Sequence, residues 1–115
     1  MSVRYRTDDD IGILDVRIRY APSLPLVRLT GELDLGSAHL LTDAIESLAA
    51  AHCPAELVIL DLHAVRFCDI AGLRAIQWCS TALAATGKQL VLYHPPAAIT
   101  KLIQVSGVAA GVTIR

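Results

Sequence analysis

An aspartate joins an apolar run to a helical pattern in the segment RFCDIAGL, residues 66–73. A strand that leads directly into a helix leaves the first backbone N–H groups of that helix unpaired, and they carry the positive end of the helix dipole. Asp69 is placed to cap this helix, and Gly72 would let the first turn approach another backbone closely. By itself, the local pattern favours the simpler interpretation, a capped helix with a packing glycine.

A cysteine, Cys68, lies directly before this aspartate. A thiol near a helix N-terminus can have a lowered pKa and react with oxidants, so Cys68 is a candidate redox site. The simpler alternative is a buried and inert thiol. Together with Cys53 and Cys79 it makes an odd number of cysteines without CxxC spacing, which indicates a reducing compartment and no disulfide framework.

The helix that follows Asp69 has two different faces. At 100° per residue, one face collects side chains that we expect to pack on a sheet: Gly72, Leu73, Ile76, Cys79, Ser80 and Leu83. The opposite stripe places Ile70, Arg74 and Trp78 at i, i+4 and i+8, with Thr81 beside them. Trp and Arg are the residue types most enriched among binding hot spots, so the stripe predicts a protein-binding surface. The alternative is that the N-terminal segment covers Trp78.

No other group of residues predicts catalysis or cofactor binding. His52, Cys53, His63 and Cys68 do not have the spacing of a zinc site. Glu32 and Asp34 lack a nearby nucleophile or histidine, and they fit surface charges for docking better than paired catalytic carboxylates. The motifs GxGxxG, GxSxG and HExxH and the P-loop do not occur. We therefore expect no metal, no cofactor and no enzyme activity.

Composition restricts the protein to a compact globular class. The 115 residues fit a single domain, 1–115, and are 54% apolar against 18% charged. Ten basic and eleven acidic side chains nearly cancel, which makes nucleic-acid binding improbable. The chain has neither a membrane-spanning apolar run nor a secretory h-region, so we expect a cytoplasmic protein that does not bind membranes, as a monomer or weak homodimer.

Hydrophobic patterns predict five strands and three helices, after a flexible N-terminal extension over residues 1–10. Residues 11–20 and 25–33 have the β-branched content of a hairpin. A helix follows with Ser37 as N-cap and Pro54 closing it. The later elements are a strand at 56–62, a helix from Asp69 to Gly87, a strand at 88–93, a helix at 94–107 and a short strand at 111–115.

This order, ββαβαβαβ, predicts an α/β fold with a mostly parallel central sheet of about five strands and crossover helices. The continuous apolar run in residues 56–62 is typical of a central strand that is buried on both faces. In the last helix, Pro95 and Pro96 suit the first turn and Gly107 suits the left-handed residue after the final turn.

Three segments, in this order, make the chain resemble a STAS domain of the anti-sigma factor antagonist family. They are VRLTGELDLGSA at 27–38, LVILDLHAVRFCDIAGL at 57–73 and GKQLVLYHPPAAITKLIQVSGV at 87–108. The resemblance implies a STAS fold and a kinase-type anti-sigma factor as partner, which docks on the loop around Asp34 and on the start of the helix after Asp69. The expected partner-binding residues are Asp34, Gly36, Ser37, Asp69, Ile70, Ala71, Gly72, Leu73, Arg74 and Trp78.

The sequence departs from the family at the position that is phosphorylated in regulated members. A serine is expected after Asp69, but Ile70 and Ala71 stand there and neither carries a hydroxyl. A phosphate there would add about −1.5 to −2 charges, which would weaken an interface that already holds carboxylates. This off switch is therefore absent, and phosphorylation of Ser37 is not expected to replace it.

Three consequences of Ile70 compete. It could leave the protein permanently competent to bind, it could exclude the family's usual partner, or control could have moved to Cys68. The leading hypothesis is an anti-sigma factor antagonist-like protein that regulates sigma-factor-dependent transcription. The alternative is a STAS scaffold or sensor subunit of a larger signalling assembly, with redox control through Cys68.

Overall fold

The computed structural model describes residues 2–6, 14–20, 24–51 and 55–115 of the chain. Their elements follow one another as β1 (Ser2–Arg6), β2 (Leu14–Arg19), β3 (Leu26–Leu33), α1 (Ala38–Ala50), β4 (Leu57–Cys68), α2 (Ile70–Ala84), β5 (Gln89–Tyr93), α3 (Ala97–Ser106) and β6 (Thr113–Ile114).

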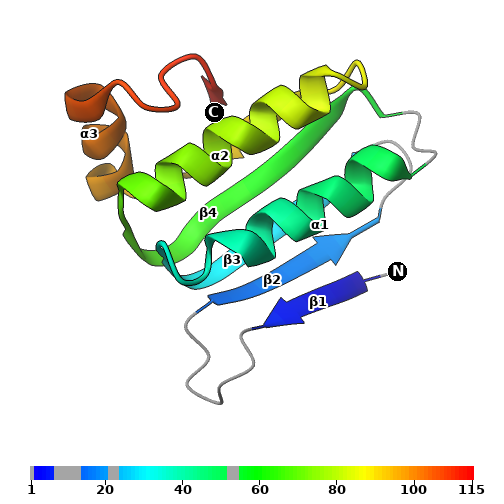
Figure 1. The fold of residues 1–115 in the computed structure, drawn as a ribbon, viewed down its shortest axis with the longest axis horizontal. Helices are drawn as coiled ribbons and strands as arrows, with labels where there is room; N and C mark the ends of the chain where they lie inside the picture. The colour runs from blue at the N-terminus through cyan, green and yellow to red at the C-terminus, as the bar shows by residue number, and fades with distance from the viewer. Residues whose placement is uncertain (1, 7–13, 21–23, 52–54) are drawn as a thin grey trace.

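The six strands form one sheet in which spatial order equals chain order, β1-β2-β3-β4-β5-β6. Figure 1 shows β1 to β4 side by side in this order. The pairings of β1 with β2 and of β2 with β3 are antiparallel. The three pairings that follow are parallel, and a helix connects the two strands of each: α1 between β3 and β4, α2 between β4 and β5, and α3 between β5 and β6. The predicted α/β class, the hairpin, the central position of the third predicted strand and the crossover helices are confirmed.

The structure corrects the prediction for the N-terminus. Residues 1–10 were expected to form a flexible extension, but Ser2–Arg6 form β1 at the edge of the sheet, in register with β2. The segment SVRYR is short and rich in arginine, so its alternation gave a weaker strand signal than the aliphatic strands. The sheet therefore has six strands rather than about five, and residues 7–10 lie outside the described part of the chain.

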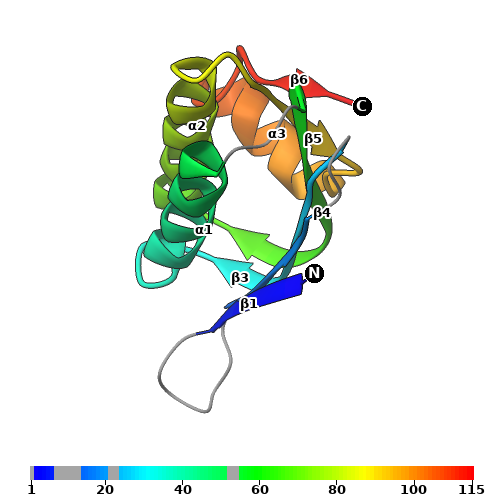
Figure 2. The same ribbon diagram turned by 90° about the vertical axis from the view of Figure 1, so that its right-hand side faces the viewer.

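The helices α1 and α2 cover one face of the sheet, and Figure 2 shows the opposite face without a helix over it. Residues alternate between these faces along β2 and β3, with the apolar ones buried beneath the helices. The core beneath α1 and α2 includes Val16, Ile18, Val27, Leu29, Val58, Leu60, Leu41, Ile45, Leu48, Leu73, Ile76 and Leu83.

The prediction that the third strand is buried on both faces is wrong. Strand β4 extends to twelve residues, and on the helix-free side Leu57 and Ile59 are half-buried while His63 is exposed. A continuous apolar run does not distinguish a strand covered by helices on both sides from one whose second face is only partly shielded.

The helix ends agree with the sequence signals in part. Asp69 and Gly107 act as predicted, because Asp69 accepts a hydrogen bond from the Gly72 N–H and Gly107 adopts φ 74° after α3. Pro95 and Pro96 precede the first turn of α3, with Pro96 at the N-cap. Pro54 lies outside the described residues. Over the described part of the chain, no helix combines the length and the hydropathy that a bilayer crossing requires.

The contact between α2 and β3 leaves no room for a side chain at Gly72. A Cβ atom there would lie 2.4 Å from the carbonyl oxygen of Leu33 and 2.9 Å from Sγ of Cys68. Because one of these atoms belongs to the backbone of β3, α2 could accommodate a methyl group only by moving away from the sheet.

We expect Gly72→Ala to lower the free energy of unfolding by a net of about 1–2 kcal/mol, because a clash with a backbone atom lies at the upper end of the roughly 1–3 kcal/mol that overpacking costs. The loss should be visible although alanine is the better helix former by about 1 kcal/mol. Urea unfolding followed by circular dichroism measures it. Gly111→Ala is the matched control, since a Cβ there would meet no atom within 4 Å. Equal stability of the two variants would contradict a tight contact at Gly72.

Candidate functional site

The turn after β3 and the start of α2 lie side by side at one edge of the sheet. Strands β3 and β4 run parallel, so their carboxyl ends meet, with Leu33 in register with Cys68. The N–H of Asp69 donates to the carbonyl of Leu33 at 3.3 Å, which ties the two ends together. The structure therefore brings together the two segments that the resemblance assigns to partner docking.

Asp69 holds the first turn of α2. Its Oδ1 accepts a hydrogen bond from the Gly72 N–H at 2.8 Å. One of the orphan donors of the helix is thereby satisfied within the chain. Ile70 and Ala71 follow in the first turn, both partly buried, and neither presents a hydroxyl there.

Asp34 organises the turn between β3 and α1. Its Oδ1 accepts hydrogen bonds from the N–H groups of Gly36 at 3.0 Å and Ser37 at 3.1 Å, and lies 3.2 Å from the Ser37 hydroxyl oxygen. This carboxylate was expected to be a free surface charge for docking. Instead, one of its oxygens holds the shape of the loop, so Asp34 positions its neighbours in addition to contributing charge.

Ser37 has a structural role that differs from the one predicted. Its hydroxyl lies 2.8 Å from the Glu32 carbonyl oxygen and accepts a hydrogen bond from the Asp34 N–H, while no side-chain bond caps α1. The residue is 0% exposed. Ser37 therefore cannot contact a partner in this conformation, and a kinase could not reach its hydroxyl without opening the loop.

Of the remaining predicted residues, some are buried beneath the junction and others are exposed on its surface. Gly72 and Leu73 are buried and support the junction from beneath. Gly36, Arg74 and Trp78 are exposed, and Trp78 keeps 43% of its surface accessible. Arg74 and Trp78 of the predicted stripe on α2 thus face solvent, while Ile70 at its start is partly buried. Within the described residues no segment covers Trp78.

Two exposed apolar side chains beside the junction were missed. Leu35 at the tip of the β3–α1 turn is 80% exposed, and Phe67 near the end of β4 is 51% exposed. The available signals were a leucine between turn residues and the only phenylalanine of the chain two residues before a capping aspartate. We define the junction surface as five residues: Leu35, Phe67, Ile70, Arg74 and Trp78.

A groove of about 220 Å³ adjoins this surface between the end of β4 and α3. Phe67 and Cys68 line one wall, while Pro96, Ile99 and Leu102 line the other. The junction surface is therefore bordered by an apolar hollow as well as by exposed apolar side chains, a combination typical of protein-binding surfaces.

The environment of Cys68 favours the inert thiol over the redox site, the two alternatives that the sequence left open. Burial and, as the smaller cause, the neighbouring negative charge of Asp69 together raise the pKa of its thiol to about 12. Although Cys68 lies next to the N-terminus of α2, desolvation outweighs the helix dipole. Burial likewise raises the pKa of Cys79 to about 12. Cys68 therefore stays a protonated thiol at neutral pH.

The spacing of His52, Cys53, His63 and Cys68 did not predict a zinc site. His52 and Cys53 lie outside the described part of the chain. Over the residues that the structure describes, no three His, Cys, Asp or Glu side chains gather into a group that could hold a metal ion.

Comparison with known proteins agrees with this geometry. Residues 16–114 match the family model described as "Mlab, STAS domain". No curated protein matches the sequence. Among solved structures, the fold is similar to the anti-sigma factor antagonist SpoIIAA from Bacillus in its unphosphorylated form, with 18% identity and a TM-score of 0.67 over 87% of this chain and 86% of that one.

Two further structures share the fold. An anti-sigma factor antagonist from Mycobacterium paratuberculosis is 22% identical, with a TM-score of 0.68 over 96% of this chain and 89% of that one. The murine Slc26a9 anion transporter in its inward-facing state is 18% identical, with a TM-score of 0.69 over 93% of this chain but only 18% of the transporter chain. At these identities the likeness establishes the fold.

We expect Cys68 to resist alkylation at pH 8. With a pKa of about 12 instead of the ordinary 9.0, its thiolate fraction at that pH falls by roughly a thousandfold. The rate with iodoacetamide, followed by mass spectrometry on a Cys53→Ser, Cys79→Ala variant, should be correspondingly lower in the folded protein than in urea. A folded-state rate within tenfold of the unfolded rate would show that the thiol is activated after all.

Proposed function

Because this chain belongs to the STAS domain family, we propose that it acts as an anti-sigma factor antagonist-like protein that binds a kinase-type anti-sigma factor. By capturing that factor it would regulate sigma-factor-dependent transcription, without enzyme activity and in the cytoplasm, as a monomer or weak homodimer. One observation carries the proposal: the junction surface is exposed, while buried and hydrogen-bonded residues hold its shape.

The composition of the junction surface suits a protein partner. Leu35 and Trp78 expose apolar area that solvent contacts in the free protein, so covering them would gain roughly 25 cal/mol per Å² of apolar surface. Arg74 lies one helical turn from both Ile70 and Trp78, where its guanidinium can pair with a carboxylate of a partner at the rim. Aromatic and arginine anchors on a preorganised frame are typical of binding hot spots.

The position of Ile70 favours an antagonist that is always competent to bind over one whose usual partner is excluded by this side chain. The side chain is already partly buried at the start of α2, so only part of it projects toward a partner. Covering the remainder would add apolar contact, up to about 1.5–3 kcal/mol for complete burial of such a side chain. Without a hydroxyl at this position, the anti-sigma kinase could not phosphorylate residue 70 and so could not weaken the complex in this way.

A second candidate function is a STAS scaffold subunit in a larger assembly. It is favoured by the fold that this chain shares with the Slc26a9 transporter, where the matching part is only 18% of a longer chain. The neighbouring genes distinguish the candidates. An adjacent anti-sigma kinase or PP2C-type phosphatase gene supports the antagonist, and adjacent transporter or sensor genes support the scaffold.

We expect calorimetric titration against the kinase-type anti-sigma factors of the same organism to detect binding at micromolar concentrations. Trp78→Ala and Arg74→Ala should each weaken that binding by at least fivefold, equivalent to more than about 1 kcal/mol, with little loss of stability. Tyr93→Ala and Arg19→Ala are matched controls, because these residues are exposed on the helix-free face. Absence of binding to every such factor at tens of micromolar would refute the antagonist function.

We expect Ile70→Ser to restore a phosphate switch. Incubated with the binding kinase and ATP, the variant should incorporate one phosphate at residue 70, while the natural chain and Ile70→Ala incorporate none. Phosphorylation should then weaken binding by at least tenfold, since it adds about −1.5 to −2 charges beside Asp69. Intact-mass spectrometry and calorimetry measure both effects. Phosphate on the natural chain would reveal a different regulatory hydroxyl.

A further inference from the structure

A hollow lies on the helix-free face of the sheet, away from the junction surface. It has a volume of about 540 Å³. Its apolar lining comes from Leu24, Leu26, Ile59 and Tyr93, and its charged lining from Arg19, Arg28 and Asp61. A second hollow of about 370 Å³ continues it toward His63 and His94, and the two share Arg28 and Asp61. Both volumes lie in the range of small-molecule sites.

The register of the sheet concentrates arginines beside this hollow. Arg17 on β2 lies directly opposite Arg28 on β3, and Arg19 lies two residues further along the same face. Like charges directly opposite each other on adjacent strands are unfavourable. Asp15 compensates Arg17 at 3.5 Å and Asp61 compensates Arg28 at 3.2 Å, but Arg19 has no ion pair with any described residue. This local excess of positive charge occurs in a chain whose formal net charge is −1.

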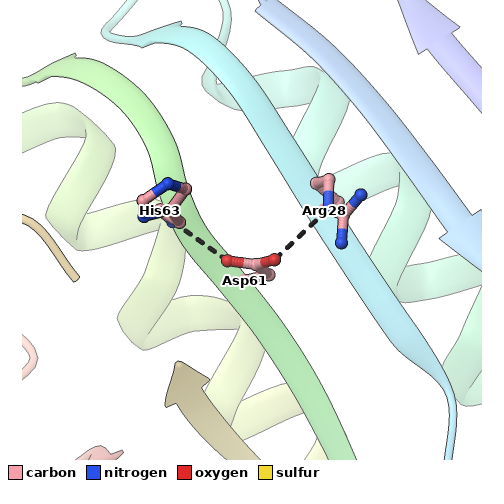
Figure 3. Close-up of polar contacts among 3 residues, drawn as sticks. All are labelled: Arg28, Asp61 and His63. Carbon is pink, nitrogen blue, oxygen red and sulfur yellow. Dashed lines mark hydrogen bonds and ion pairs between the residues drawn. The ribbon is translucent and has the colours of Figure 1, made fainter. Parts of the chain in front are cut away.

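Asp61 fixes the arginine between the two hollows. It is one of the few buried polar residues, 8% exposed, and Figure 3 shows it between Arg28 and His63. Its Oδ2 accepts from Nε of Arg28 at 3.2 Å, and its Oδ1 accepts from the His63 N–H at 3.0 Å. The terminal nitrogens of Arg28 make no hydrogen bond to the described residues, so they remain available to a ligand on an arginine that is already oriented.

The apolar lining of the hollow favours a ligand that has an apolar body as well as a negative charge. Leu26 is in register with Ile59, and Asp61 is in register with Tyr93, so the apolar and charged residues occupy adjacent rows of the sheet. The Tyr93 ring stacks on His94 with 3.8 Å between the centroids, which fixes an aromatic wall. An inorganic anion would leave these apolar groups in water, and an uncharged ligand would leave Arg19 without a partner.

We propose that this face binds a small organic anion, with its carboxylate or similar group on Arg19 and Arg28 and its apolar or aromatic body over Leu26, Ile59 and Tyr93. The site is separate from the junction surface, so its existence does not depend on anti-sigma factor binding. The guanidinium groups of the two arginines can donate hydrogen bonds to both oxygens of a carboxylate. The apolar side chains would then cover the body of the ligand and exclude water from it.

The test uses 1-naphthoate as the probe, 1-naphthamide as its uncharged counterpart and acetate as the anion without an apolar body. We expect calorimetry to give a Kd of about 0.1–1 mM for 1-naphthoate, with both counterparts at least tenfold weaker. The ¹⁵N spectrum should shift at the Arg28 side-chain Nε and at the backbone amides of Ile59 and Tyr93. Arg19→Gln should weaken 1-naphthoate at least tenfold, while Arg66→Gln, the same charge change on an exposed arginine outside both hollows, should leave it unchanged.

Several outcomes would overturn the proposal. Equal binding of 1-naphthoate and 1-naphthamide, unchanged binding in Arg19→Gln, or spectral shifts centred elsewhere would each do so. If 1-naphthoate does not bind but hexaglutamate does, the face belongs to an acidic protein segment. If sedimentation shows a dimer that Arg19→Gln dissociates and 1-naphthoate does not bind, the face belongs to a second copy of the chain.

Discussion

The close approach of Gly72 to the last carbonyl of β3 is the contact on which the junction depends. It draws the first turn of α2 onto the carboxyl end of the sheet, where the Asp69 N–H donates to the same Leu33 carbonyl oxygen. Any side chain at residue 72 would separate these backbones. The shape of the junction surface is therefore set by backbone packing, and the side chains of Leu35, Phe67 and Trp78 remain exposed on it in the free protein.

The architecture was largely predictable because its signals are local. The capping aspartate, the left-handed Gly107 and the apolar faces of α1 and α2 each depend on residues within a few positions of one another. Strand β1 escaped prediction because an edge strand needs no continuous apolar pattern. The missing cover over β4 escaped for a different reason: whether a second layer of helices exists depends on the whole topology, and periodicity in one strand carries no information about it.

The candidate site was predictable as a location but less so as a set of roles. Ser37 and Asp34 have residue types typical of surfaces, yet hydrogen bonds within their turn assign them to holding the loop. The exposure of Leu35 and Phe67 follows from how the turn and the strand end are oriented, which sequence spacing does not determine. For Cys68, the competition between a helix dipole and desolvation was decided by burial, a property of the assembled fold.

Ile70 lies between the two residues that hold the first turn of α2, Asp69 and Gly72. The Asp69 cap and the Gly72 contact are intact on either side of Ile70, which is the arrangement that the proposed antagonist function requires. The thiol of Cys68 stays protonated at neutral pH because its pKa is raised, so it supplies no reactive thiolate beside this position. Control of binding at this surface would then have to come from the amount of protein present or from another surface. The helix-free face lies away from the junction surface, and its oriented arginine and its hollow give it the shape and charge to receive a ligand.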